Sequence, residues 1–463
     1  MSLIGSLFIS YSGLYTNTIA TKVTADNLSN LNTTGFKGSR CEFLNEVVGS
    51  NQEVMRCEGY GSFVKSISTI YTQGGLQTTD IPTDLAILGK GFFIVKDSKG
   101  NIFYTRDGQF YVNEVDENNF ALQNSLGMYL LGAEPDAKTM DLNVLKPYLI
   151  PKLMPPKGSS KISAQLIFDS RITANTRNLL ENYSFDKDNP LVPLKDGEYD
   201  YVWEFTIYDT YGTKVNLRLY ADRGENINEY EVLLSLSDPT LDKRGEGPYK
   251  GAFLYGKLTF GAAGDVISAE FSQISDTEGT LTPIDLIQTG YPEFILNLEG
   301  NNQKITLDLG FKVREDGTIE RKINASALMA NAFSQLFYDQ DGYPLGVFDR
   351  IEIITEEGLI IAWYTNQQQA DVSRIFLADF TGYEGSLEKV GNNLFRTKVG
   401  IKPFIFAPSS SERGRIMSGA LETSNVDIAN EMLNLIVLQR AFQSNARVMT
   451  TADQMMEDFI RQV

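Results

Sequence analysis

The sequence predicts a multi-domain, mainly β protein with α-helical termini, in which nested β-domains lie between two helices that pair as a coiled coil. Three observations support this class. Both ends of the chain show apolar residues at heptad spacing. The region between them contains many short segments of alternating apolar and polar residues, separated by turn-forming residues. At 463 residues, the chain also exceeds the size of a domain with one core.

The C-terminal helix is predicted over residues 425–463, and the stretch from Leu421 to Ile460 contains neither proline nor glycine. Its seam positions follow one another in alternating steps of four and three residues, which is the spacing of a coiled coil. Only Gln439 and Asp453 interrupt the apolar character of this seam. The apolar seam positions, which we expect to serve self-assembly, are Ile428, Met432, Leu435, Phe442, Ala446, Met449, Met456 and Ile460.

The N-terminal helix is predicted over residues 1–32, where the same rhythm surrounds only two charged side chains, Lys22 and Asp26. Its apolar seam positions are Ile4, Leu7, Tyr11, Leu14, Ala25 and Leu28. Each fully buried large apolar side chain contributes roughly 1.5–3 kcal/mol, whereas association costs roughly 4–15 kcal/mol. A single contact through this seam is therefore marginal, and several contacts at once suit a polymer. On the residues alone, intramolecular pairing and self-assembly remain equally open.

The ends of the two helices carry boundary signals. Asn-Thr-Thr-Gly at 32–35 is predicted to stop the first helix and turn the chain. Ser424 or Asn425 is expected to cap the second helix, while Asp427 and Glu431 place negative charge in its first turns. Polar residues on or beside the C-terminal seam, which either set register between subunits or face solvent, are Gln439, Arg440, Gln443 and Asn445.

Between the helices, the chain is predicted to leave and return through nested parts. Residues 33–73 and 405–424 are expected to form an extended connecting arm. Residues 74–149 and 343–404 are expected to form an inner β-domain, and residues 150–342 an outer β-region of one or two subdomains.

The inner β-domain is predicted from short apolar segments separated by glycine, such as 84–88 and 91–95. Asp107-Gly108 lies between the β-prone segments 102–105 and 109–112 and is predicted to be a hairpin turn. On the return, strands are expected at 351–354, 359–364 and 375–380.

The outer region follows a linker rich in proline, where neither a helix nor a central strand forms. Alternation within 202–208 and 230–234 is typical of half-buried strands. Loop-like insertions are expected at 172–198 and 237–250, and 275–345 is a candidate small subdomain. Further strand candidates are 161–168, 214–220, 253–260, 266–271, 294–298 and 304–309.

Four motifs, in this order along the chain, resemble those of the bacterial flagellar rod and hook proteins. They are ADNLSNLNTTGFKGSR (25–40), GGLQTTDIPTDLAILGKGFFIV (74–95), YTRDGQF (104–110) and SGALETSNVDIANEMLNLIVLQRAFQSNARVMTTADQMM (418–456). WEFTIYDTYGTKVNLRLYADRG and GSLEKVGNNLF (385–395) are similar to segments of that family's outer and inner β-domains. The positions that carry the resemblance are Asn27, Asn30, Asn32, Thr34, Gly35, Phe36, Asp84, Gly89, Gly91, Phe92, Phe93, Arg106, Gly108, Glu422, Ser424, Asn425, Val426, Asp427, Gln439, Arg440 and Asn445.

The resemblance implies a structural subunit of the flagellar hook, which self-assembles in many copies into a helical tube and transmits torque from rod to filament. It implies that the terminal helices line the inner core of the tube, that the arm and inner β-domain form a middle shell, and that the outer domain contacts neighbours. It also implies rod proteins, a hook cap and hook–filament junction proteins as partners. Export to the extracellular part of the flagellum is expected through the flagellar type III apparatus, without a cleaved signal peptide.

Two alternatives remain. A distal rod protein of the same family shares the four motifs, although the long insertion at 150–342 favours the hook. From another class, a secreted carbohydrate-binding β-protein explains the strands and the acidic residues. That alternative does not explain why both chain ends have heptad spacing.

The composition of the chain also excludes several kinds of partner and of catalytic site. A net charge of −18 argues against nucleic acid and anionic membrane surfaces as partners. Apolar runs fall short of a membrane span, and the start of the chain lacks the pattern of a signal peptide. Histidine is absent, which removes Ser/His and Cys/His nucleophilic sites and nearly every zinc site. For the two cysteines, Cys41 and Cys57, a disulfide, two free thiols and a bond between subunits remain open.

Two segments that look like ligand-binding motifs are interpreted as turns. Gly89-Lys90-Gly91 lacks the spacing of a phosphate-binding loop, and DQDGY at 339–343 lacks the distal glutamate of a calcium loop. With 59 acidic residues, some carboxylate pair falls at glycosidase spacing by chance. We therefore expect no catalytic, cofactor-binding or metal-binding residues, and no enzymatic activity.

Overall fold

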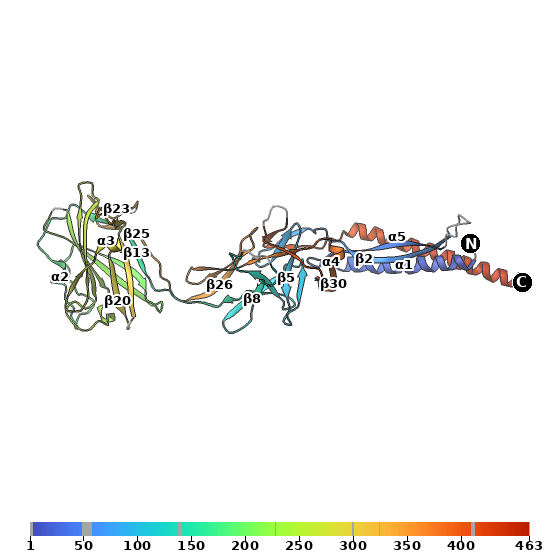
Figure 1. Ribbon diagram of the computed structural model, residues 1–463, viewed down its shortest axis with the longest axis horizontal. Coiled ribbons are helices and arrows are strands. Elements are labelled where there is room, and N and C mark those ends of the chain that lie inside the picture. The colour runs from blue at the N-terminus through green and yellow to red at the C-terminus, as the bar shows by residue number, and fades with distance from the viewer. Residues whose placement is uncertain are drawn as a thin grey trace. The chain divides into compact units, whose positions relative to one another are not determined.

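The chain divides into two compact units, one inserted into the sequence of the other. The computed structural model describes residues 3–48, 58–137, 141–226, 228–298, 301–323, 325–408 and 413–462. The first unit contains Met1–Lys152 and Phe348–Val463, and the second unit contains Leu153–Val347 (Figure 1). The predicted class is confirmed, because two long helices lie at the ends of the chain and strands dominate the region between them.

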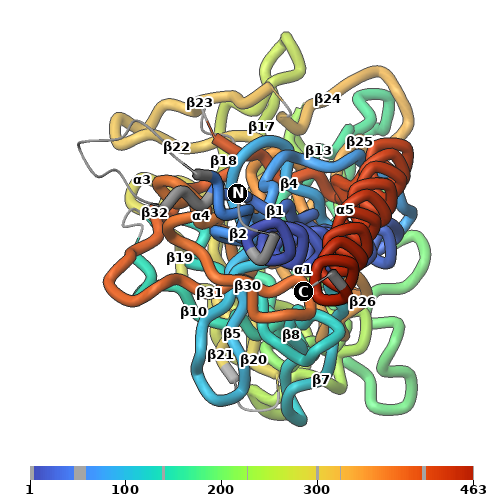
Figure 2. Tube along the Cα trace, turned by 90° about the vertical axis from the view of Figure 1, so that its right-hand side faces the viewer, coloured from blue at the N-terminus to red at the C-terminus, as the bar shows by residue number. Residues whose placement is uncertain are grey.

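In the first unit, the two terminal helices pack against each other. Helix α1 (Leu3–Ser29) lies along α5 (Ile428–Gln462), as Figures 1 and 2 both show. Two long antiparallel strands, β1 (Ser39–Val48) and β2 (Glu58–Thr69), also pack against α1. Much of the segment 33–73, predicted to be an extended connecting arm, therefore consists of these two paired strands.

The β-domain of the first unit combines strands from both sides of the insertion. The main path of its sheet runs β26-β27-β28-β9-β5-β6-β31-β30, and a shared core that includes Phe92, Tyr104 and Phe395 holds the two halves together. Its strands before the second unit are β3 (Leu76–Thr78), β4 (Leu85–Leu88), β5 (Phe92–Lys96), β6 (Ile102–Thr105), β7 (Phe110–Glu114), β8 (Asn119–Asn124), β9 (Tyr129–Ala133), β10 (Lys146–Pro147) and β11 (Ile150–Pro151). The elements on the return are β26 (Gly346–Ile353), β27 (Leu359–Tyr364), β28 (Gln369–Ile375), β29 (Leu377–Asp379), α4 (Tyr383–Ser386), β30 (Leu387–Gly391), β31 (Leu394–Thr397), β32 (Phe404–Phe406), β33 (Arg415–Ser418) and β34 (Ala420–Glu422).

Two predictions about this domain are wrong. Asp107-Gly108 is no hairpin turn, since β6 pairs with β5 and β31 while β7 pairs with β8. A Cβ atom on Gly108 would lie 1.6 Å from the carbonyl oxygen of Leu85, so this glycine allows two backbones to pass in contact. Residues 405–424 are no connecting arm, because β32, β33 and β34 pair with β29, β4 and β3.

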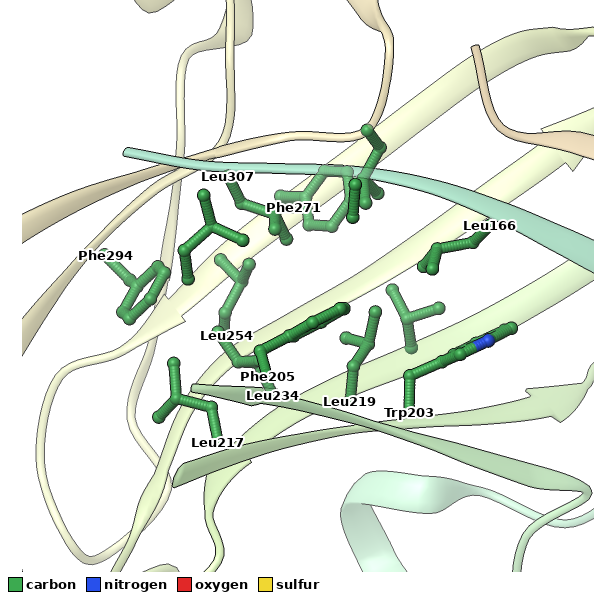
Figure 3. Packing of buried hydrophobic residues seen from close by; sticks show 14 of the residues in the cluster. Leu166, Trp203, Phe205, Leu217, Leu219, Leu234, Leu254, Phe271, Phe294 and Leu307 are labelled. Atoms are coloured by element: carbon green, nitrogen blue, oxygen red, sulfur yellow. The ribbon is translucent and has the colours of Figure 1, made fainter. Parts of the chain in front are cut away.

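The second unit consists of two main sheets around one core. The six-stranded sheet runs from β14 to β19 in sequence order, and the five-stranded sheet contains β20, β21, β13, β24 and β25. Figure 3 shows side chains from both sheets in one cluster, with Leu166, Phe294 and Leu307 near Phe205, Leu219 and Leu234. Residues 275–345 therefore form no separate subdomain, because their strands share this core.

The elements of the second unit are β12 (Leu153–Met154), β13 (Lys161–Asp169), α2 (Leu179–Asn182), β14 (Tyr201–Tyr208), β15 (Lys214–Arg223), β16 (Glu229–Leu236), η1 (Pro239–Leu241), β17 (Ala252–Phe260), β18 (Val266–Ile274), β19 (Leu281–Pro283), α3 (Leu286–Thr289), β20 (Glu293–Leu298), β21 (Asn301–Asp308), β22 (Phe311–Val313), β23 (Ile319–Arg321), β24 (Ala327–Met329) and β25 (Ser334–Gln340). The segment DQDGY, predicted to be a turn, begins in the last two residues of β25. Just after the strand, the Asp341 carboxylate accepts hydrogen bonds from the backbone N–H groups of Ser160 and Lys161.

Candidate functional site

A buried cluster of three charged side chains joins distant parts of the first unit. The Nζ atom of Lys37 lies 2.5 Å from Oε1 of Glu422, and Nη1 of Arg106 lies 3.0 Å from Oε2 of the same carboxylate. All three side chains are almost fully buried. We refer to Lys37, Arg106 and Glu422 as the junction. A buried charge is tolerated only when it is paired and hydrogen-bonded, and here each charge has both kinds of partner.

Backbone groups complete the junction. Oε1 of Glu422 accepts a hydrogen bond from the N–H of Gly74, and the Glu422 carbonyl accepts one from the N–H of Gly35. Lys37 also donates to the carbonyl of Thr72, and Arg106 donates to the carbonyl of Gly89. The junction therefore ties together the segment after α1, the segment after β2, two turns of the β-domain and the strand that precedes α5.

The balance of charge at the junction is uneven, because two cations share one carboxylate. Burial lowers the pKa of Lys37, and the charge of Arg106 lowers it further, while the attraction of Glu422 opposes both effects. Glu422 is thus the group on which both cations depend. The guanidinium of Arg106 also lies 5.3 Å from the centre of the Phe92 ring, which adds a cation–π contact.

Two asparagines extend the junction to the helices. Asn27 of α1 exchanges hydrogen bonds with the backbone of Ser39 on β1 and donates to Glu431 of α5 at 3.0 Å. Asn425 accepts from the N–H of Gly38 and donates to the carbonyl of Ile70. Asn425 therefore does not cap α5 but binds the chain segments beside it.

The predicted C-terminal seam is only partly covered within one chain. Leu435, Ala446 and Met456 are half-buried, whereas the other five predicted positions are exposed. The covered side of α5 includes Glu431 and Asn445, which lie against α1 residues Asn27 and Gly13. The large apolar side chains of α5 that remain exposed are Ile428, Met432, Leu433, Ile436, Val437, Phe442, Val448, Met449, Met455, Phe459 and Ile460.

The predicted N-terminal seam is likewise not the covered face of α1. Its positions Leu7, Leu14 and Leu28 are half-buried, Tyr11 and Ala25 are exposed, and the side chain of Ile4 lies outside the described part. The fully covered residues of α1 are small or polar, namely Ser10, Thr16, Ala20, Thr24 and Asn27. Small side chains let α1 approach β2 closely, as where Thr16 contacts Ser62 through their hydroxyl groups at 3.3 Å. The spacing therefore identifies apolar positions but not the face that this chain covers itself.

Four models of protein families match successive parts of the chain. "Flagella basal body rod protein" matches residues 8–37 and "Flagellar hook protein FlgE/F/G D1 domain" matches residues 86–163. "Flagellar basal body protein FlaE D2 domain" matches residues 178–343, and "Flagellar basal body rod FlgEFG protein C-terminal" matches residues 417–462. The three charged residues of the junction fall in three different matches.

Curated relatives match the chain over nearly its whole length. A flagellar hook protein FlgE of Treponema pallidum is 29% identical and covers 98% of both chains. The chain belongs to the flagellar hook protein family. The protein of the same name from Borreliella burgdorferi is 28% identical over 98% of this chain and 99% of its own. That of Salmonella typhimurium is 27% identical over 97% of this chain and 98% of its own.

The hook-family motif residues concentrate at the junction and next to it. Gly35 has a φ of +67°, and Asn393 donates to the carbonyl of Thr34 at 2.8 Å. Phe92 and Phe93 lie in the core of the β-domain. Lys37 lies in the motif at 25–40, but it is not among the residues that the sequence analysis selected as functional. Its two partners lie 35 and 385 positions away, so local sequence does not reveal them. The one sequence feature that could have pointed to Lys37 is its charge within a segment otherwise rich in Gly, Thr and Asn.

Other motif residues have simpler positions in this hook-family chain. Asp84 forms an isolated bridge with Gln109, and Ser424 is buried beside the start of α5. Gln439 and Arg440 are exposed, while Asn445 is half-buried against α1. The remaining positions, in the turns or at the helix ends, are Asn30, Asn32, Phe36, Gly91 and Val426.

The described part of the chain offers little for other chemistry. Cys41 is half-buried on β1, and Cys57 lies outside the described residues. Within the ranges given above, no three Asp, Glu, Cys or His side chains are grouped as a metal site requires. None of the described helices is long and apolar enough to cross a membrane.

Asp427, not Ser424 or Asn425, caps α5, and this leads to a first prediction. Its carboxylate accepts hydrogen bonds from the N–H groups of Ala429 at 2.8 Å and Asn430 at 3.2 Å. Asp427→Ala should lower the free energy of unfolding of the first unit by about 1 kcal/mol, because two N–H groups lose their acceptor. Asp427→Ser should restore most of the loss. Equal losses in urea denaturation of both variants would contradict the capping role.

Proposed function

We propose that this hook-family chain is the structural subunit of a flagellar hook, and that many copies assemble into a helical tube that transmits torque from rod to filament. The observation that carries the proposal is the match to flagellar hook proteins over 97–98% of the chain, both helical ends included. The exposed apolar residues of α5 support it, because a helix that is apolar on several sides is normally buried in a larger structure.

The two helices would supply the cohesion of the tube. A face that α1 leaves uncovered includes Phe8, Tyr11 and Tyr15, each more than half exposed. Burying such side chains contributes roughly 1.5–3 kcal/mol each. If each copy makes a few such contacts with several neighbours, the summed free energy of burial exceeds the association cost of roughly 4–15 kcal/mol. Assembly through this surface is therefore favourable in a polymer, in which each copy has many neighbours.

The second unit would supply contacts that exchange easily. Many of its surface ion pairs, such as Arg314–Glu320 and Lys304–Glu293, are substantially exposed to solvent. Exposed pairs contribute only about 0–1 kcal/mol, so neighbours that meet through such groups can slide without a large barrier. This combination of firm apolar contacts and weak polar contacts is what a flexible joint requires.

The assembled tube would have other flagellar proteins as partners at both of its ends. Within the flagellum, the tube would contact rod proteins at one end and a hook cap, and later hook–filament junction proteins, at the other. The subunit would be non-enzymatic, and it would reach the extracellular part of the flagellum through the flagellar type III apparatus without a cleaved signal. A distal rod protein is the second candidate. The match of residues 178–343 to a D2 domain and the hook names of the relatives favour the hook.

Deletion of 425–463 tests this function. The purified full chain should form hollow tubes visible by electron microscopy, whereas the truncated chain should remain monomeric. The truncated chain should also keep its β-sheet circular dichroism, because the hydrophobic cores of the inner β-domain and of the second unit include no side chain from α5. Tubes from the truncated chain, or loss of its β signal, would contradict the roles assigned to the helices and the β-domains.

A further inference from the structure

One face of the six-stranded sheet in the second unit is covered by a long segment with little regular structure. This segment, residues 171–200, contains the short helix α2, and we refer to it as the cover. Leu179, Tyr183 and Leu194 of the cover pack against Tyr220 and Leu233 of the sheet. The opposite face of the sheet carries the main core shown in Figure 3.

A row of charged residues runs across the strands beneath the cover. Asp222 on β15 is directly opposite Glu231 on β16, and Glu231 is directly opposite Lys257 on β17. Asp200 ends the cover, and its N–H donates to the carbonyl of Ala221, which places it beside Asp222 on the other side. Directly opposite residues point to the same face of a sheet, and like charges there repel. Three carboxylates thus stand side by side.

The cations in this row are fewer than the carboxylates. Nη2 of Arg177, from the cover, lies 2.6 Å from Oδ1 of Asp200 and 2.7 Å from Oδ1 of Asp222. Lys257 lies 2.9 Å from Glu231, and its more distant contact with Glu229 at 3.6 Å adds a fourth carboxylate. The row is therefore short of positive charge.

The remaining groups that face Asp222 do not neutralise it. Asn175 of the cover donates to Oδ1 of Asp222 at 3.4 Å, while Oδ2 is buried without a hydrogen-bond partner among the described residues. Arg223 offers Asp200 only its backbone N–H, because its guanidinium donates to the carbonyls of Ser170 and Ile172. Burial, followed by the charge of Glu231, raises the pKa of Tyr255 on β17, so this tyrosine adds no positive charge to the row. A buried carboxylate oxygen without a donor is costly unless a proton supplies one.

We propose that Asp222 and Asp200 share one proton that fastens the cover to the sheet, so that the cover is a pH-responsive element of the second unit. With the proton present, the two carboxyl groups hydrogen-bond to each other and Arg177 balances the remaining negative charge. Without it, two adjacent carboxylates face one guanidinium, and the cover loosens over Tyr220 and Leu233.

The titration of Asp222 agrees with this geometry. Burial, followed by the charge of Asp200, raises the pKa of Asp222 from its ordinary 3.8 to about 7, although Arg177 opposes the shift. Because this pKa is higher in the closed state than in the open state, closing takes up a proton. The cover is therefore held most firmly at low pH, loosens as the pH rises from the ordinary pKa of 3.8 through about 7, and changes little above that value.

Hydrogen exchange on the full chain, measured by mass spectrometry on peptides from the cover, tests the proposal. After correction for the intrinsic exchange rate, protection of the cover should be roughly a hundredfold higher at about pH 5 than at about pH 8, because pH 5 lies two units below a pKa of about 7. Asp222→Asn should give high protection at both pH values, since the amide donates to Asp200 as the proton did. Asp200→Asn should do the same from the other side of the pair, and it decides the outcome if the first variant does not fold.

The matched control is Asp188→Asn, which removes an exposed charge from the same segment. It should keep the pH dependence of the unmodified chain. Equal protection of the unmodified chain at both pH values would overturn the proposal. So would a loss of protection at about pH 8 in Asp222→Asn or Asp200→Asn that matches the unmodified chain.

Discussion

Glu422→Gln should destabilise the first unit by about 3–5 kcal/mol, because it leaves Lys37 and Arg106 buried without a counter-charge. The chain has two tryptophans, and they report on different units: Trp363 lies on β27 and Trp203 on β14. In a Trp203→Phe background, urea denaturation followed by tryptophan fluorescence should therefore show the loss in the first unit alone.

A surface pair of the same type provides the control for this prediction. Glu388 pairs with Arg396 at 3.2 Å, and both side chains are more than half exposed. Glu388→Gln should change the free energy of unfolding by less than about 1 kcal/mol. Lys37→Met should cost less than Glu422→Gln, because it leaves one cation with one carboxylate and removes a lysine whose pKa burial already lowers. If Glu422→Gln and Glu388→Gln have equal effects, the junction does not hold the first unit together.

The double variant Met432→Ser and Ile436→Ser should abolish tube formation while leaving the free chain folded. Both side chains are nearly half exposed in the single chain, so truncation removes only the covered part of each there. In a tube the exposed half of each side chain would also be buried, so each substitution should cost, at every copy, roughly half of the 1.5–3 kcal/mol that full burial contributes. Because every subunit carries the change, the losses add along the polymer.

The matched control replaces the same two residues by leucine. Met432→Leu with Ile436→Leu keeps the surface apolar and helix-compatible, and should still form tubes. Sedimentation of assembled material measures tube formation, and circular dichroism of the free chain shows whether each variant is folded. Equal assembly of the serine and leucine variants would show that this side of α5 lies outside the contacts between subunits.

The sequence was sufficient to place the terminal helices and most strands. The predicted strand at 359–364 coincides with β27, because a short continuous run of apolar residues favours a strand, and the alternation within 230–234 lies inside β16. The heptad spacing found only part of the apolar surface of α5, since exposed residues such as Leu433, Ile436 and Val437 lie outside the predicted seam. It did not show which apolar positions a single chain covers, because spacing indicates a need for burial and not the identity of the neighbour.

The junction was beyond sequence reasoning for a different physical reason. Glu422 lies hundreds of positions from both cations. In the sequence, Lys37 and Glu422 look like any exposed charges until the fold buries them. The position of Gly108 is also set by a tertiary contact, since its neighbour Leu85 belongs to β4. Asp107-Gly108 suggested a hairpin because a dipeptide shows only a local preference for a type of turn. Here tertiary contacts determine how β6 and β7 pair.

Helical reconstruction of the assembled protein from electron micrographs tests the central claim most directly. The account predicts a hollow tube in which α1 and α5 line the innermost wall, with Met432 and Ile436 buried against helices of neighbouring copies. It also predicts that the second unit lies at the outer surface and contacts neighbours mainly through polar groups. A tube with α5 exposed to solvent, or with the second unit lining the channel, would contradict the account.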